Sequence, residues 1–132
     1  MSRVLALDFG AARCGCALSD PTGTLATPLP VVERPDTRRG MQRLVQLVRE
    51  RDVATVVVGL PLSLSGDEGP QALLTREWAG RLAARLGPGV PVELHDERLT
   101  TVQASRSGGE ADEDSRAAAH LLEAYLAAGA RA

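Results

Sequence analysis

The 132-residue sequence contains no lysine and few aromatic side chains. All 15 basic residues are arginines, and Phe9, Trp78 and Tyr125 are the only aromatic residues. A hydrophobic core must therefore be built from Leu, Val and Ala. With 44% hydrophobic residues, the composition is that of a globular protein and excludes a disordered chain. A net charge of −2 argues against a bulk positive field of the kind that drives nonspecific nucleic-acid binding.

Cysteine is also scarce. Cys14 and Cys16 flank one residue of an expected strand, so we expect two packed thiols and no disulfide between them. A zinc site would need more ligands than His95 and His120 add. No apolar run reaches the roughly 18 residues of a membrane span, and the N-terminus shows no signal-peptide pattern. We therefore expect a cytoplasmic protein without membrane contact.

A length of 132 residues suits one domain with one core, over residues 1–132. Pro28 and Pro30 place the third strand at a sheet edge, and Asp36 or Thr37 can cap the first helix. The element order predicts an α/β fold: a five-stranded mixed sheet, made of a three-strand antiparallel meander plus two parallel strands, with helices on both faces. Strands are predicted at residues 5–8, 13–19, 24–32, 55–59 and 90–95, and helices at 37–51, 70–86, 100–106 and 112–128.

Acidic residues follow two of the predicted strands. Asp8 ends a buried apolar run, where an unpaired charge is costly unless it binds a metal, although Asp-x-Gly is also common turn chemistry. Asp96 and Glu97 end the last strand, and strand alternation puts them on opposite faces. The pattern leaves open which of these two acids joins Asp8.

A third acid comes from the last predicted helix. Asp114 precedes Ala118, Leu121 and Tyr125 by 4, 7 and 11 residues, so it continues the apolar stripe and should face the sheet. An acid here also suits a helix N-terminus, although that does not explain its inward phase. Three converging carboxylates would repel each other unless cations neutralise them. Oxygen ligands favour Mg²⁺ or Mn²⁺, and a pair of such ions about 4 Å apart is typical of displacement at phosphorus.

The sequence resembles the bacterial YqgF family, also called RuvX, whose members are described as Holliday junction resolvases and pre-16S rRNA nucleases. That resemblance covers nearly the whole chain and implies a ribonuclease H-like fold. It is carried by residues 7–10 with Arg13 and Gly15, by residues 57–62 followed by Gly66, Gly69 and Pro70, by residues 95–101, and by residues 114–118 leading to Leu121, Leu122, Tyr125 and Leu126.

This resemblance implies a catalytic and metal-binding triad of Asp8, Glu97 and Asp114, holding two Mg²⁺ or Mn²⁺ ions, with Asp96 in a supporting role. It also implies a nucleic-acid partner, either pre-rRNA or branched or single-stranded DNA. We expect a monomer or a weak homodimer. Further contacts to nucleic acid are expected at Gly10, Arg13, Arg98, Thr100, Arg106 and Arg116. For the arginines, the alternative is a surface or ion-paired position.

Two features depart from the family pattern. Ala11 and Ala12 stand where Thr and Lys are usual, and residues 107–113 are short and acidic instead of long and lysine-rich. A separate arginine cluster at residues 34–51 fits either a solvated helix face or a phosphate-contacting patch. The two departures from the family pattern concern substrate affinity more than the catalytic centre.

The function predicted is that of a metal-dependent nuclease that hydrolyses phosphodiester bonds, foremost in processing the ends of pre-16S rRNA. One alternative is a non-catalytic RNA-binding factor in ribosome assembly. Another is a nucleotide-binding module, because Asp-x-Gly turns also bind phosphate in actin-like ATPases. Those ATPases need two such domains, and 132 residues do not provide them.

Overall fold

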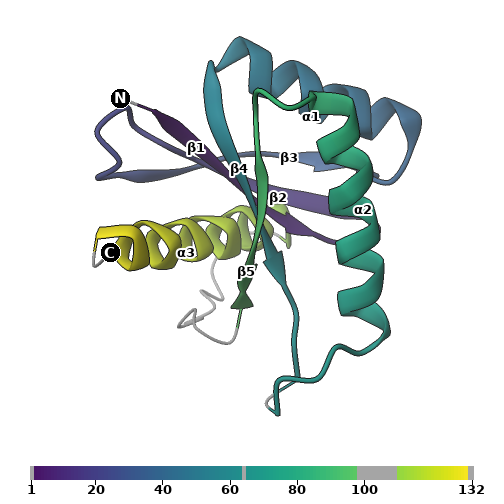
Figure 1. The fold of residues 1–132 in the computed structure, drawn as a ribbon. Coiled ribbons are helices and arrows are strands. Elements are labelled where there is room, and N and C mark those ends of the chain that lie inside the picture. Colours follow the sequence, from purple (N-terminus) through teal and green to yellow (C-terminus); the bar gives the residue numbers. More distant parts are fainter. Residues whose placement is uncertain (1, 64, 98–109, 131–132) are drawn as a thin grey trace.

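The computed structural model describes residues 2–63, 65–97 and 110–130. In this part of the chain, three consecutive strands are followed by two further strands and three helices that alternate, in the predicted order (Figure 1). Their bounds are β1 Arg3–Phe9, β2 Arg13–Ser19, β3 Ala26–Glu33, α1 Arg38–Glu50, β4 Val53–Leu60, α2 Pro70–Leu86, β5 Val92–Asp96 and α3 Glu110–Ala130. The helix predicted at residues 100–106 lies outside the described residues.

The strands form one mixed sheet in the order β3-β2-β1-β4-β5. β1, β2 and β3 pair antiparallel, whereas β4 runs parallel to both β1 and β5. The predicted meander plus two parallel strands is thus confirmed, and β3 lies at the edge where Pro28 and Pro30 are tolerated. Because β1, β4 and β5 run in the same direction, they end together, at Phe9, Leu60 and Asp96. We call this rim of the sheet the carboxyl edge.

Helices α1 and α2 cover one face of the sheet. Leu5 and Leu7 of β1 point to this face, together with both cysteines, which are free and fully buried as predicted. Trp78 of α2 is completely buried; its ring stacks on Phe9 with centroids 4.4 Å apart, and its Nε1 donates to the carbonyl of Pro35 at 3.1 Å. Trp78 therefore connects α2 to the carboxyl edge and to the segment leading into α1.

Helix α3 covers the other face. Strand alternation turns Val4, Ala6 and Val57 toward α3, where they pack on Ala118 and Leu122. The hydroxyl of Ser115, itself buried, donates to the carbonyl of Leu29 at 2.5 Å and so attaches the start of this helix to β3. The two cores confirm that helices lie on both faces.

Local signals set the helix positions. Thr37 caps α1 by accepting from the amide of Gly40 at 3.1 Å. In α2, Leu74, Trp78, Leu82 and Leu86 recur every four residues, yet they do not form one buried row: Trp78 and Leu82 are buried, whereas Leu74 is 56% exposed. Smaller residues, Ala72 and Thr75, take the inward positions there instead. Among the described residues, no helix is long and apolar enough to cross a membrane.

Candidate active site

The acids at the ends of β1 and β5 lie on the α3 face. Asp8 alternates in phase with Val4 and Ala6, which pack against α3. Gly59 pairs with His95 of β5, so Glu97, two residues after His95, returns to the same face as Gly59. Strand alternation alone left the choice between these two acids open, and the structure brings Glu97, the acid that the family resemblance implies, to Asp8, with Asp96 in the opposite row.

Gly59 makes room for Glu97. A Cβ placed on Gly59 would lie 2.6 Å from Oε1 of Glu97 and 2.8 Å from its Cγ. The Glu97 side chain thus lies directly over the bare backbone of β4, the strand between β1 and β5. Glycine at this position is what allows the carboxylate to approach β1.

Asp114 reaches the site from α3. A Cβ on Gly15, the residue paired with Asp8 across the β1–β2 ladder, would lie 1.9 Å from the backbone oxygen of Asp114. The first turns of α3 therefore rest on the β2 backbone beside Asp8. The Asp114 side chain is about one-third exposed, and its Oδ2 accepts from Nε of Arg13 at 2.9 Å.

The electrostatics at Asp8 reflect this crowding of acids. Burial raises the pKa of Asp8 from 3.8 to about 8, assisted by the charge of Glu97, by a side-chain hydrogen bond with Glu97 and by the charge of Asp114. With a pKa of about 8, Asp8 keeps its proton at neutral pH. A carboxyl group with this environment at a strand end marks a candidate functional site.

The described residues include no group of three or more His, Cys, Asp or Glu side chains already arranged to hold a metal ion. The donor chemistry of Asp8 and Glu97 nevertheless fits a hard divalent cation: two adjacent carboxyl groups, with the pKa of Asp8 raised by burial and by its acidic neighbours. Asp114 does not join them as it stands, because Arg13 holds it. The three predicted acids are therefore brought to one edge without forming a finished coordination sphere.

Other residues with sequence-based predictions lie around these acids. Gly10 forms the β1–β2 turn, where a Cβ would come within 2.9 Å of the carbonyl oxygen of Arg13. Arg13 was expected to contact phosphate, and the structure pairs it with Asp114. Arg116, on α3, is partly exposed and has interactions of its own. The predicted contacts Arg98, Thr100 and Arg106 fall outside the described residues.

Residue-by-residue reasoning from the sequence gave no role to two positions at this site. Gly15 and Gly59 hold no ligand and carry no side chain, yet each removes the atom that would block an acid. A glycine inside a strand pattern is the available signal, because such a residue often marks close approach of another group.

Comparison with protein-family models confirms the family resemblance of the sequence. The model for RuvX, described as Holliday junction resolvase, matches residues 2–128. The chain belongs to the RuvX family. Curated relatives support this: a Streptomyces avermitilis protein named "Putative pre-16S rRNA nuclease" is 51% identical over 104 residues, covering 79% of this chain and 66% of its own length. A Nocardioides protein of the same name is 48% identical and covers 92% of this chain and 85% of its own.

Solved structures agree on the fold. RuvC from Thermus thermophilus, in complex with a Holliday junction substrate, superposes on this RuvX chain with a TM-score of 0.61 at 14% identity, covering 98% of this chain and 97% of RuvC. RuvC in a second Thermus thermophilus structure gives a TM-score of 0.60. The RuvX chain therefore has the ribonuclease H-like fold expected of it.

Proposed function

We propose that this RuvX chain is a metal-dependent nuclease that hydrolyses phosphodiester bonds in the maturation of pre-16S rRNA. Its family membership and the names of its relatives support the substrate. One observation supports the chemistry: at the carboxyl edge the side chain of Glu97 hydrogen-bonds Asp8, and Asp114, paired with Arg13, lies near enough for its charge to raise the pKa of Asp8. Branched or single-stranded DNA is a second substrate class to be tested.

Asp8 and Glu97 would hold Mg²⁺ or Mn²⁺, with Asp114 joining them after it leaves Arg13. Such ions, when bound, supply an activated water and stabilise the leaving oxygen. The chain itself does three things: β1 and β5 fix two carboxyl groups at one edge, Gly59 lets them approach each other, and the α3 contact at Gly15 sets the position of Asp114. We expect the protein to work in the cytoplasm as a monomer or weak homodimer.

The direct test compares the wild type with Asp8→Asn on precursor rRNA, single-stranded DNA and junction DNA, under one Mn²⁺ condition. Cleavage should vanish in the variant, while folding and RNA binding persist. A variant that cleaves at the wild-type rate would remove the nuclease assignment. Calorimetric titration of Mn²⁺ into the wild type and Asp114→Asn tests the cation site without relying on turnover.

One observation favours a second candidate, a non-catalytic RNA-binding factor in ribosome assembly. The Arg13–Asp114 ion pair engages one of the three acids that a two-ion site would need. Cells that carry Asp8→Asn in place of the wild-type protein separate the two functions: normal 16S rRNA maturation would support the binding factor, and accumulated precursor would support the nuclease.

A further inference from the structure

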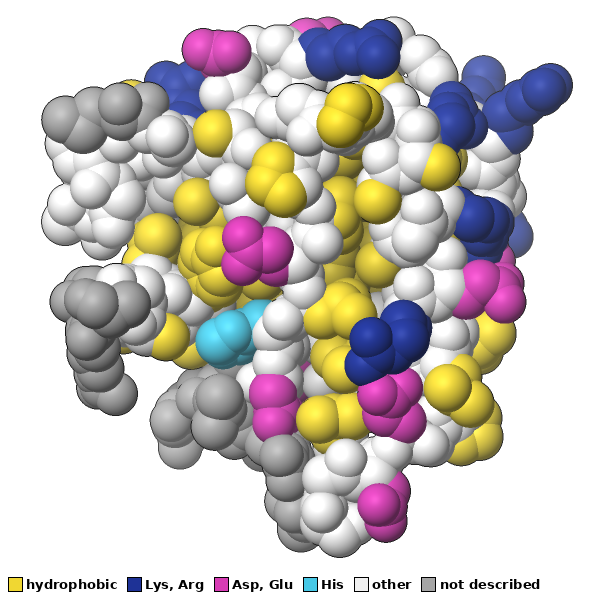
Figure 2. All heavy atoms as spheres, viewed as in Figure 1, with side chains coloured by type: hydrophobic (Ala, Val, Ile, Leu, Met, Phe, Trp, Pro, Cys, Tyr) yellow, Lys and Arg dark blue, Asp and Glu magenta, His cyan; other side chains and the backbone are white. Residues whose placement is uncertain are grey.

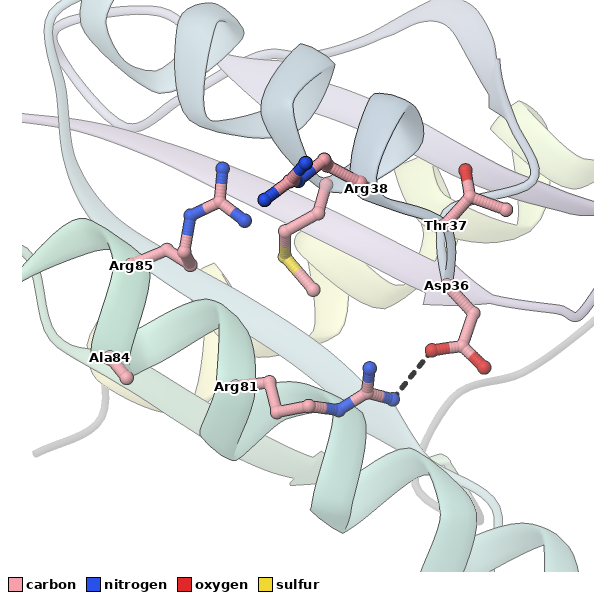
Figure 3. A pocket seen from close by; sticks show the side chains of 7 residues that line it. Asp36, Thr37, Arg38, Arg81, Ala84 and Arg85 are labelled. Atoms are coloured by element: carbon pink, nitrogen blue, oxygen red, sulfur yellow. Dashed lines mark hydrogen bonds and ion pairs between the residues drawn. The ribbon is translucent and has the colours of Figure 1, made fainter.

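A pocket of about 330 Å³ opens between α1 and α2, on the face of the sheet opposite α3 (Figure 3). Its walls carry three guanidinium groups, those of Arg38 on α1 and of Arg81 and Arg85 on α2. Met41 and Ala84 add apolar surface between them. The pocket shares no residue with the carboxylate site, so it calls for an explanation of its own.

Two of these arginines face each other without an acid between them. Arg81 is neutralised by Asp36, with Nη2 and Oδ1 2.5 Å apart. Arg85 donates to the neutral side-chain oxygen of Gln42 at 2.8 Å, and Arg38 has no ion pair within the described part of the chain. In Figure 3 the guanidinium groups of Arg38 and Arg85 point toward one another across the pocket. Like charges held this way favour an anion between them.

The start of α1 adds to the positive potential. Thr37, the N-cap, lines the pocket, and the first turn of this 13-residue helix has no acidic residue. The amide end of the helix dipole therefore adds to the guanidinium charge. More broadly, arginine side chains gather over α1 and the C-terminal half of α2, at the upper right of Figure 2.

The α1 end of the pocket lies on the carboxyl-edge side of the sheet. Glu33, the last residue of β3, pairs with Arg13, the arginine that binds Asp114, and α1 begins only a few residues later. From the α2 side, Trp78 stacks on Phe9, the neighbour of Asp8, and donates to the carbonyl of Pro35, the residue before Asp36 of the pocket. Arg81 and Arg85 follow one and two turns later, as α2 runs away from the carboxyl edge. The pocket therefore adjoins this rim at its α1 end.

We propose that the α1–α2 pocket binds a backbone phosphate of the nucleic-acid strand held at the carboxylates, with Arg38 and Arg85 as its ligands. This proposal rests on the proposed function in that it takes nucleic acid as the substrate. The guanidinium fork matches phosphate oxygens, and a nucleotide's sugar or base can cover the apolar wall beside it. The arginine cluster at residues 34–51 then includes a phosphate-contacting member and is more than a solvated face.

The test measures binding without cleavage, using fluorescence anisotropy of labelled single-stranded RNA and DNA of one sequence in the presence of a chelator. The wild type is compared with Arg38→Gln/Arg85→Gln. The matched control is Arg39→Gln/Arg49→Gln, two exposed α1 arginines outside the pocket whose loss changes the net charge equally. Circular dichroism confirms that all three proteins are folded.

The pocket variant should bind both strands about tenfold more weakly near 0.1 M salt, and its slope of log affinity against log salt should fall by about 1.4, as expected for two lost contacts on a single strand. The control should change by less than about threefold. Equal losses in both variants, no loss in either, or a loss restricted to RNA or to DNA would overturn the proposal. Persistent cleavage by Asp8→Asn would instead remove the nuclease assignment and leave this binding result standing.

Discussion

Arg13 of β2 donates its Nε–H to Oδ2 of Asp114 on α3 at 2.9 Å, joining two residues that are 101 positions apart in the chain. Both side chains are about one-third exposed. The pair places a built-in countercharge beside three acids, where the sequence predicted a phosphate contact. A divalent cation that recruits Asp114 must compete with this arginine.

Removal of that countercharge should strengthen cation binding. Arg13→Gln frees Asp114, so we expect Mn²⁺ to bind about fivefold more tightly, equivalent to about 1 kcal/mol for a partly exposed ion pair. Isothermal titration calorimetry measures the affinity directly. Arg49→Gln, an exposed position on α1, is the control and should leave the affinity unchanged. Weaker Mn²⁺ binding by Arg13→Gln would show that Arg13 positions Asp114 for the ion instead of competing with it.

The raised pKa of Asp8 predicts an unusual pH dependence of stability. Folded Asp8 keeps its proton up to a pKa of about 8, whereas the unfolded chain releases it near 3.8. The folded state therefore binds more protons between these values, and its free energy of unfolding should fall as pH rises, by up to about 1.4 kcal/mol per unit. Below pH 3.8 Asp8 carries its proton in both the folded and the unfolded state, so the stability that is lost at higher pH is fully present there.

Urea unfolding in chelator across this range measures the effect. Asp8→Asn should flatten the profile and be more stable than the wild type at pH 8, because the amide has no charge to bury. Mg²⁺ or Mn²⁺ should restore the wild type at pH 8, since a cation favours the ionised carboxylate. A wild-type profile that rises with pH would contradict the account of Asp8.

Gly59→Ala tests the space over β4. The new Cβ would fall 2.6 Å from Oε1 of Glu97, so this flexible carboxylate must move away from Asp8 while the sheet stays intact. We expect cleavage to drop by at least about tenfold, since misplacement of a reacting group by about 1 Å can cost even more. Gly80→Ala is the control, because a Cβ there meets nothing within 4 Å. Full activity in Gly59→Ala would exclude a role for the present position of Glu97.

Gly15→Ala should act on the fold instead of on one side chain. Its Cβ would lie 1.9 Å from the carbonyl oxygen of Asp114, and a helix backbone cannot move as a side chain can. We expect a loss of about 2–3 kcal/mol in the free energy of unfolding, as for overpacked cores. Gly80→Ala should instead gain up to about 1 kcal/mol from helix propensity. Chemical denaturation of both variants measures the free energies of unfolding. A Gly15→Ala variant as stable as the wild type would contradict the close contact.

Hydrophobic pattern alone predicted most of the fold. The unbroken β-branched run before Gly59 is typical of a buried strand, and Met41, Leu44 and Val48 recur at helical spacing along α1. In α2 the strict four-residue repeat that starts at Leu74 drifts around a helix of about 3.6 residues per turn, so Leu74 falls outside the buried stripe. Packing put Ala72 and Thr75 inward there instead.

The sequence by itself determined that acids would end β1 and β5 and that Asp114 would face inward, since these follow from strand and helix periods. Strand periods alone could not choose between Asp96 and Glu97, the acid that the family resemblance implies. The tertiary structure brings Glu97 to Asp8, admits the acids over bare backbone at Gly15 and Gly59, and pairs Asp114 with Arg13. These outcomes depend on strand register and on the approach of segments up to 101 residues apart. A local sequence pattern cannot predict strand register or the approach of distant segments, because both depend on how whole elements pack.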